Sequence, residues 1–145
     1  MRIIHNNKKA YHNFFISDTL EAGIALKGGE IKSVSAGKVN LSDSYVVIKD
    51  GEALLRNCYI APQDSALESD AKRTRKLLLH KDEILRLNRQ TLEKGMSIIP
   101  TKIYLTKGRA KVEIGLAKGK KLYDKRQSLK DRQTKREIDR AIKNY

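Results

Sequence analysis

Three histidines and one cysteine are the first side chains of this sequence to consider for catalysis or metal binding. His5, His12 and His80 are far apart along the chain and match no HExxH or His/Cys metal-ligand spacing. Cys58 lies in the run LLRNCYI, where a buried structural thiol is more common than a nucleophile. These residues form no catalytic or metal-binding constellation, so they do not predict an enzyme.

One further stretch, GLAKGK at residues 115–120, imitates the phosphate-binding loop of nucleotide-hydrolysing enzymes. It is one residue short between its glycines, and Lys121 stands where a Ser or Thr would hold Mg²⁺. The hypothesis of a phosphate-transferring or hydrolytic enzyme therefore rests on an incomplete motif. We predict a protein that is not an enzyme and uses no metal or cofactor.

A large excess of positive charge is more informative. The 145 residues include 31 Lys and Arg against 17 Asp and Glu, a net charge of +14. Residues 118–145 hold half of this excess, +7. Such a field attracts polyanions, which makes nucleic acid the leading partner class and an anionic membrane surface the alternative.

The sequence contains no segment that would enter a membrane. No apolar run approaches the roughly 20 residues that span a bilayer, and the N-terminal MRIIHNNKKAYHNFF lacks the apolar core of a secretory signal. We therefore expect a cytoplasmic protein with no membrane partner. A single cysteine also excludes an intrachain disulfide.

Three separated segments combine basic residues with aromatic or apolar ones. NNKKAYHNFF has the mixture that holds phosphates and stacks on bases, although it could equally be a basic N-terminus beside core aromatics. AKRTRKLLLHK could bind RNA or be the edge of a solvated loop. GLAKGKKLYDKRQ places five basic residues in thirteen. Because all three segments share one sign, together they favour RNA binding.

Two acidic residues, Glu21 and Glu30, interrupt this basic background. A carboxylate in a basic groove can accept hydrogen bonds from base amino groups or a 2′-hydroxyl, or orient a neighbouring lysine. The alternative is a structural salt bridge at the end of a strand. The residue types alone leave both interpretations open.

The elements that must position these residues are mostly short strands. Turn dipeptides predict two hairpins, one around Asp50 and Gly51 and one around Lys107 and Gly108. The return strand of the second alternates apolar and charged residues, which predicts one buried and one solvated face. Upstream, NFFIS and LEAGIAL predict two more strands with a turn at residues 18–19.

Two segments predict helices. GEIKSVSAG is short and ends near Gly37, whereas HKDEILRLNRQTLEKG is longer and ends at Gly95. The longer one carries an apolar stripe of Ile84, Leu85, Leu87 and Leu92. The polar segment APQDSALESDAKRTR predicts a mobile loop. About six short antiparallel strands with a helix between the hairpins fit a small closed barrel of the OB type.

The C-terminal segment has a pattern of its own. Ser128 and Asp131 resemble a capping box and precede a narrow apolar stripe of Ile138, Ala141, Ile142 and Tyr145. Such a stripe is only marginally stable as an isolated helix in water, so the segment is typical of one that folds on a binding surface. We predict a barrel domain over residues 1–123 and a basic tail over residues 124–145 that is disordered when free.

Several stretches together resemble the SsrA-binding protein (small protein B) family, the bacterial partners of transfer-messenger RNA. They occur in the family's order over nearly the whole chain and read NKKAYHNFFI, LEAGIALKGGEIKSVSAGKVNLSDSYV, TRKLLLHKDEI and VEIGLAKGKKLYDKR. The resemblance implies a mainly β fold, a small closed antiparallel OB-type barrel of about six strands with flanking helices and a basic C-terminal tail.

The resemblance also implies a function. Members of the family are RNA-binding proteins that bind the tRNA-like domain of transfer-messenger RNA and deliver it to stalled ribosomes for trans-translation. The implied partners are this RNA, the decoding centre and mRNA channel of the ribosome, and elongation factor Tu, indirectly through the alanine-charged RNA. The protein would act as a monomer, with its tail helical on the ribosome.

Carried over residue by residue, the resemblance places RNA-contacting or RNA-dependent positions at Asn7, His12, Glu21, Tyr45, Leu78, Lys111 and Gly119. Basic, polar and aromatic neighbours extend the predicted RNA-binding set to Lys8, Phe14, Lys38, Asn40, Arg75, Lys76, Lys118, Lys120 and Lys121. The predicted ribosome-binding tail positions are Asp124, Lys125, Arg126 and Ile138. Gly115 and Gly119 are expected to permit close approach of the backbone to RNA.

The chain departs from the family's pattern at three places. Phe14 stands where relatives often have Tyr, Gln127 where they often have Glu, and Asp70 precedes Ala71 instead of Pro. The alternative to the family function is a structural ribosomal protein, which would also be small, basic, OB-like and tailed. Such a protein would be assembled permanently into a subunit instead of being held by one free RNA.

Overall fold

Strands dominate the part of the chain that the structure, a computed structural model, describes: residues 1–62 and 70–120. The strands are β1 (Arg2–Asn6), β2 (Phe14–Ile24), β3 (Val39–Asn40), β4 (Tyr45–Lys49), β5 (Glu52–Arg56), β6 (Tyr59–Ile60), β7 (Arg75–Leu78), β8 (Ser97–Thr106) and β9 (Arg109–Gly119). The helices are α1 (Lys8–Asn13), α2 (Gly28–Ser35) and α3 (Lys81–Lys94).

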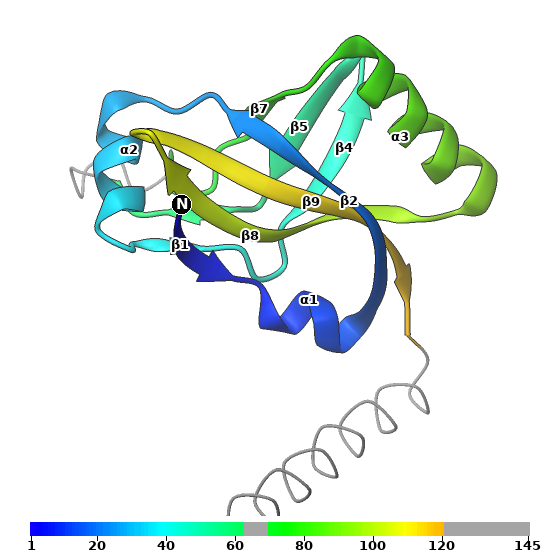
Figure 1. The fold of residues 1–145 in the computed structure, drawn as a ribbon, viewed down its shortest axis with the longest axis horizontal. Coiled ribbons are helices and arrows are strands. Elements are labelled where there is room, and N and C mark those ends of the chain that lie inside the picture. Colours follow the sequence, from blue (N-terminus) through cyan, green and yellow to red (C-terminus); the bar gives the residue numbers. More distant parts are fainter. Residues whose placement is uncertain (63–69, 121–145) are drawn as a thin grey trace, which may run out of the picture.

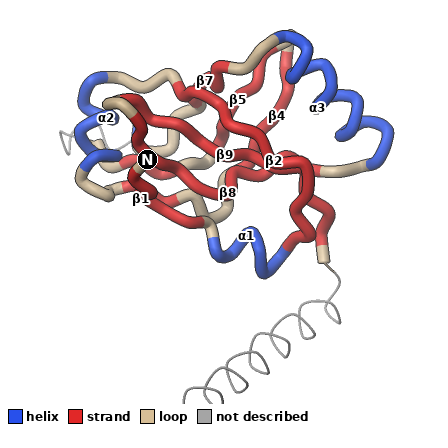
Figure 2. Tube along the Cα trace, in the orientation of Figure 1, coloured by secondary structure: helices blue, strands red, loops and turns tan. Residues whose placement is uncertain are grey.

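Six of these strands close into a ring by antiparallel pairing. Their order is β8-β4-β5-β7-β2-β9, and β9 pairs back onto β8 (Figure 1). β1 pairs with the far half of β8, and β3 and β6 form a separate two-stranded sheet. Helices flank the ring, with α2 and α3 on opposite sides of it (Figure 2). The prediction of a mainly β fold with about six antiparallel strands and flanking helices is confirmed.

Both predicted hairpins are present, and their turns have the expected backbone. Asp50 and Gly51 have φ of 52° and 74°, and Lys107 and Gly108 have φ of 51° and 74°. Positive φ at both central residues is the type I′ arrangement, whose twist matches that of the flanking strands. The alternation predicted for β9 is also confirmed, with Ala110, Val112, Ile114 and Leu116 all buried.

The interior of the ring is filled by alternate strand residues and by one face of each of two helices. The strands contribute fully buried Leu55, Leu77 and Ile103, α2 contributes Val34, and α3 contributes Ile84 and Leu87. The apolar stripe predicted for α3 is wider than the observed one. Leu85 and Leu92 point outward and are 58% and 77% exposed.

The prediction of two strands joined by a turn at residues 18–19 is wrong. The chain runs through this point as one 11-residue strand, β2. Its pairing with β9 shifts register between Ser17 and Leu20, and Asp18 has a φ of 48°. This is the behaviour of a β-bulge, in which an inserted residue bends the strand without reversing it.

The described part of the predicted mobile loop is held firmly by the fold. Ala71 and Arg75 are 7% and 0% exposed, and Arg75 begins β7. Residues 63–69, the rest of that predicted loop, lie outside the described residues.

The sequence did not predict α1, which is fixed by its cap. The side-chain oxygen of Asn7 accepts a hydrogen bond from the Ala10 N–H at 3.2 Å. The side-chain amide of Asn7 donates to the carbonyl oxygens of Pro100 at 2.8 Å and Leu41 at 3.3 Å. Asn7 thus starts the helix and ties it to the ring at the same time.

Candidate nucleic-acid interface

Outward-facing residues from four strands meet on one face of the ring. The register aligns Tyr104 on β8, Lys111 on β9, Gly23 on β2 and Leu78 on β7 in one row. The adjacent row holds Lys102, Glu113 and Glu21. We call the seven residues of these two rows the strand-face patch. It unites Glu21, Leu78 and Lys111, three predicted RNA positions that are widely separated in sequence.

Glu21 is the acidic centre of the strand-face patch. The hydroxyl of Tyr104 donates to Oε2 of Glu21, and Nζ of Lys111 lies 4.0 Å from Oε1. The Tyr104 ring is 4% exposed, whereas the Glu21 side chain is 53% exposed. Burial and the hydrogen bond to Glu21 raise the pKa of Tyr104 well above its usual value, so its hydroxyl remains a donor. The carboxylate is therefore held by the fold yet open to a ligand.

Glu113, the cross-strand partner of Glu21, is engaged differently. Its Oε2 accepts a hydrogen bond from the Thr101 hydroxyl at 2.7 Å and lies 3.8 Å from Nζ of Lys102. Its side chain is 24% exposed. Glu113 is therefore tied to its own sheet, and Glu21 is the more available acceptor of the two.

The opposite edge of the strand-face patch is apolar. Leu78 on β7 is 56% exposed, although its neighbour Leu77 is buried in the core. Lys76, two residues before Leu78 on the same outer face, lies 3.3 Å from Glu52 of β5. An exposed leucine among charged residues offers a contact for a ribose or a base face.

A second group of predicted positions lines a groove of about 850 Å³. Phe14, Tyr45, Gly119 and Lys120 all contribute to its wall, and Tyr45 is 41% exposed. Apolar side chains of α3, β4 and β8 also line it, together with Met96 from the connection between α3 and β8; those of the three elements include Val47, Leu92, Ile98 and Ile99. The structure therefore brings these four predicted residues together, apart from the strand-face patch.

Two adjacent phenylalanines at the end of α1 have different environments. Phe14 packs on Ala10 and Ala117, whereas Phe15 is 51% exposed. Nζ of Lys120 lies 4.9 Å from the centroid of the Phe15 ring and donates to the carbonyl oxygen of Tyr11 at 3.1 Å. Phe14 was predicted to bind RNA and Phe15 was not, because only the end of α1 at Asn13 determines which ring faces outward.

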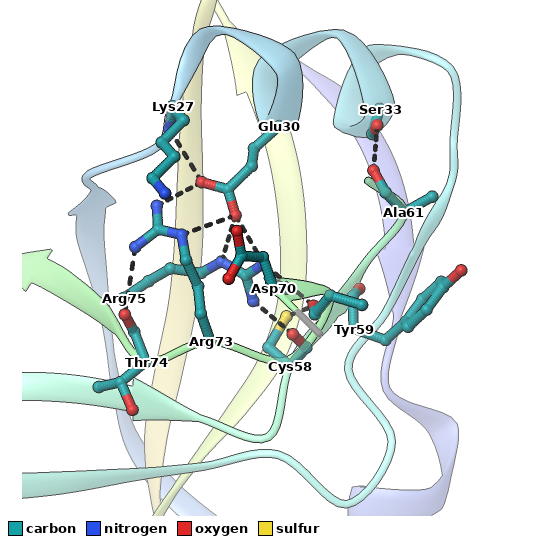
Figure 3. A network of polar contacts seen from close by, with 11 residues as sticks. Lys27, Glu30, Ser33, Cys58, Tyr59, Ala61, Asp70, Arg73, Thr74 and Arg75 are labelled. Carbon is teal, nitrogen blue, oxygen red and sulfur yellow. Dashed lines mark hydrogen bonds and ion pairs between the residues drawn. The ribbon is translucent and has the colours of Figure 1, made fainter. Parts of the chain in front are cut away.

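Arg75, which was predicted to bind RNA, is fully buried in a polar network (Figure 3). Its Nε donates to Oε2 of Glu30 at 2.7 Å, and its terminal nitrogens donate to the carbonyl oxygens of Cys58 and Ala71. Arg73 also donates to both oxygens of Glu30. Direct contact of the Arg75 side chain with RNA is therefore not available in this conformation, and the prediction is corrected.

Glu30, the centre of this network, is 8% exposed. Burial alone would raise the pKa of its carboxyl group. Hydrogen bonds from Arg73, the Lys27 backbone and Arg75 outweigh that effect and lower the pKa below its ordinary value. Of the two alternatives left open for Glu30, the structure supports the salt bridge. The bridge ties the start of α2 to β7.

The remaining predicted positions are distributed over the surface. Lys8, Lys38, Asn40 and Lys118 are exposed and His12 is half-buried. Asn7 is 2% exposed, so it can influence RNA binding only by positioning α1. Lys121 and the tail positions Asp124, Lys125, Arg126 and Ile138 lie outside the described residues.

The two glycines expected to approach RNA differ. A Cβ added at Gly115 would lie 2.7 Å from Cγ2 of Ile16, so that space is filled by the protein itself. At Gly119 nothing lies within 4 Å. Residues 115–119 belong to β9, and so the imitation of a phosphate-binding loop has the wrong backbone.

The described residues contain no cluster of His, Cys, Asp and Glu suited to a metal ion. Cys58 is 0% exposed, and its burial raises the pKa of the thiol to about 11. Among the helices of these residues, none is both long and apolar enough to cross a membrane.

Comparison with known proteins is decisive. Residues 4–144 match the family described as SmpB protein. The chain belongs to the SmpB family. The SsrA-binding protein of Persephonella marina is 53% identical over 145 residues, which covers 99% of this chain and 95% of that protein. The SsrA-binding protein of Staphylococcus haemolyticus is 54% identical over 140 residues, which covers 95% of this chain and 90% of that protein.

The SmpB fold is also found among solved structures. A chain described as "tmRNA-SmpB: a journey to the center of the bacterial ribosome" superposes with a TM-score of 0.68 at 49% sequence identity. The match covers 81% of this chain and 85% of that chain. Sequence and structure thus agree on the same family.

Proposed function

We propose that this protein binds the tRNA-like domain of transfer-messenger RNA and delivers it to stalled ribosomes for trans-translation. The carrying observation is the match of residues 4–144 to the SmpB family, together with relatives about half identical that are named SsrA-binding proteins. The similar solved chain comes from a tmRNA-SmpB complex of the bacterial ribosome. The protein is an RNA-binding factor of the cytoplasm and not an enzyme.

The strand-face patch and the separate groove form the proposed RNA surfaces. Exposed lysines elsewhere on the ring and its flanking elements, including Lys8, Lys38 and Lys118, neutralise phosphates and supply affinity that depends on salt. Glu21, Leu78 and Tyr45 contact riboses and bases, for which an acceptor, an apolar face and an aromatic ring are suited. Asn7 and Arg75 act from inside the fold by positioning these surfaces.

Two segments of the chain that differ in charge have different proposed roles. Residues 1–123 act as the RNA-binding domain, and the basic residues 124–145 act on the ribosome at the decoding centre and mRNA channel. Asp124, Lys125, Arg126 and Ile138 are the proposed contacts there. The protein works as a monomer and meets elongation factor Tu only through the charged RNA.

The decisive experiment compares two RNAs. Gel-shift titration should give tight, salt-dependent binding to the tRNA-like domain and clearly weaker binding to a duplex hairpin of equal length. Sucrose gradients of cells with and without the tagging RNA should show ribosome association only when that RNA is present. Association that persists without it would support the alternative of a structural ribosomal protein.

A further inference from the structure

We propose that Tyr104 is a positioning residue that holds the carboxylate of Glu21 as a hydrogen-bond acceptor for RNA. The RNA group that donates to the Glu21 carboxylate is an N–H on a base edge or the 2′-hydroxyl of a ribose. This inference rests on the proposed RNA-binding function and names one specific contact within it.

Glu21 has acceptor sites that its own fold does not use. A carboxylate has about four acceptor sites on its two oxygens. Tyr104 uses one of them, on Oε2. The ammonium of Lys111 is 4.0 Å from Oε1, which is longer than a hydrogen bond. With the side chain 53% exposed, the remaining sites face outward and are open to a ligand.

Tyr104 also pre-organises Glu21. An exposed glutamate on a strand samples several rotamers, and ordering it on binding opposes binding through lost side-chain entropy. Tyr104 is 4% exposed, so its side chain has little room to change conformation. A donor fixed in this way restricts Glu21 before the ligand arrives, so less ordering remains to oppose binding.

The charges around Glu21 determine which groups of an RNA can approach it. Its carboxylate repels a phosphate, whereas Lys102 and Lys111 beside it attract phosphates. An RNA strand held by these lysines presents its riboses and bases between the phosphates. The group that meets Glu21 is therefore a neutral donor, and base edges and 2′-hydroxyls are the donors of RNA.

A double-mutant cycle on RNA affinity separates this role from a merely structural one. Removing Glu21 (Glu21→Ala) should weaken binding of the tRNA-like domain by about tenfold or more, as for a lost hydrogen bond to a charged group. Tyr104→Phe keeps the buried ring but removes the donor, and should weaken binding about fivefold. Glu21→Ala with Tyr104→Phe should bind no more weakly than Glu21→Ala alone.

Other outcomes count against the inference. If Tyr104→Phe costs the same factor in both backgrounds, or costs nothing, Tyr104 does not act through Glu21. The proposed function would still stand in that case, because the wild-type protein would bind the RNA and Glu21→Ala would bind it more weakly. Failure of the wild-type protein to bind the RNA would instead overturn the proposed function itself. Thermal melts of all four proteins control for folding.

Analogue interference then identifies the donor. Pools of the tRNA-like RNA carry either scattered 2′-deoxy nucleotides or scattered inosine in place of guanosine. A position whose substitution weakens binding of the wild-type protein, but not of Glu21→Ala, marks the donor. A hit in the first pool assigns a ribose hydroxyl, and a hit in the second assigns a guanine amine. If neither pool has a Glu21-dependent position, a third pool that lacks the exocyclic amines of adenine and cytosine decides, and the absence of such a position there would overturn the acceptor role.

Discussion

The side chain of Leu78 lies across the backbone of Gly23, its directly opposed residue in the ladder between β7 and β2. A Cβ built at Gly23 would be 3.2 Å from Cβ and 3.3 Å from Cδ1 of Leu78. Gly23 is also paired with Lys111 on its other side. The absence of a side chain at this point keeps the centre of the strand-face patch flat between an apolar and a basic residue.

Gly23→Ala should therefore weaken RNA binding about threefold to tenfold while lowering stability by only about 1 kcal/mol. The added methyl group is closer to Leu78 than an ordinary contact, so Leu78 must shift away from the surface it presents. Gly28→Ala is the matched control, since nothing lies within 4 Å of a Cβ there. Equal RNA affinities of the two variants in gel-shift titration would show that the flatness at Gly23 is irrelevant.

Glu21→Ala should weaken RNA binding although it makes the protein more positive. Simple charge attraction predicts the opposite sign, so the direction of the change is diagnostic. Glu93→Ala, at an exposed position of α3, makes the same change of net charge away from the patch. It should leave binding unchanged or slightly tighter. Titrations of both variants at one fixed salt concentration test this, and tighter binding by Glu21→Ala would make Glu21 purely structural.

Glu30→Gln should make stability less dependent on pH. The folded-state pKa of Glu30 is lowered from its ordinary value of 4.5, so its contribution is present above that value. The contribution is lost as the pH falls below 4.5 and through the folded-state pKa. At neutral pH the variant should be about 3–5 kcal/mol less stable, because two arginines lose a buried partner charge. Urea unfolding at neutral and acidic pH should show this difference shrinking in acid.

Cys58 should be unreactive toward thiol reagents in the native protein. Burial raises its pKa to about 11, so almost no thiolate forms at pH 8, and the side chain is 0% exposed. Labelling by iodoacetamide should occur at the rate of unfolding and become fast in denaturant. Rapid labelling under native conditions would show that the β5–β6 region opens readily.

Removal of the tail should separate two activities. A protein of residues 1–123 should bind the tRNA-like RNA but fail to support peptide tagging on stalled ribosomes. In the full chain, Ile138→Pro should leave RNA affinity nearly intact and abolish tagging, because proline costs about 3 kcal/mol inside a helix. Lys125→Ala with Arg126→Ala should also act after RNA binding. Full tagging by the truncated protein would contradict this division.

Those parts of the fold that depend on neighbouring residues were predictable from the sequence. The turns at Asp50 and at Lys107 need only a local preference for positive φ, and the burial of β9 follows from its alternation. The cap of α1 was not predictable in this way. Asn7 bonds to carbonyl groups 34 and 93 residues away, and nothing near it in sequence identifies those partners.

The candidate site, like the fold, has features that the sequence predicts and features that depend on contacts between distant residues. The resemblance to the family could identify Glu21, Leu78 and Lys111 as RNA-binding positions. Only the strand register shows that they share one patch. A basic run could not reveal that Arg75 faces inward, because its carboxylate partner, Glu30, lies 45 residues earlier. Tyr104 was missed because one buried tyrosine in a strand has no distinctive sequence signal.

The double attachment of Lys120 fixes the point from which the rest of the chain departs. Its backbone N–H donates to the carbonyl oxygen of Asn13 at 2.9 Å. Its side-chain ammonium donates to the carbonyl oxygen of Tyr11. Because Tyr11 and Asn13 both belong to α1, Lys120 is attached to that helix at two points, and any shift of α1 on the ring would move the end of the described residues with it.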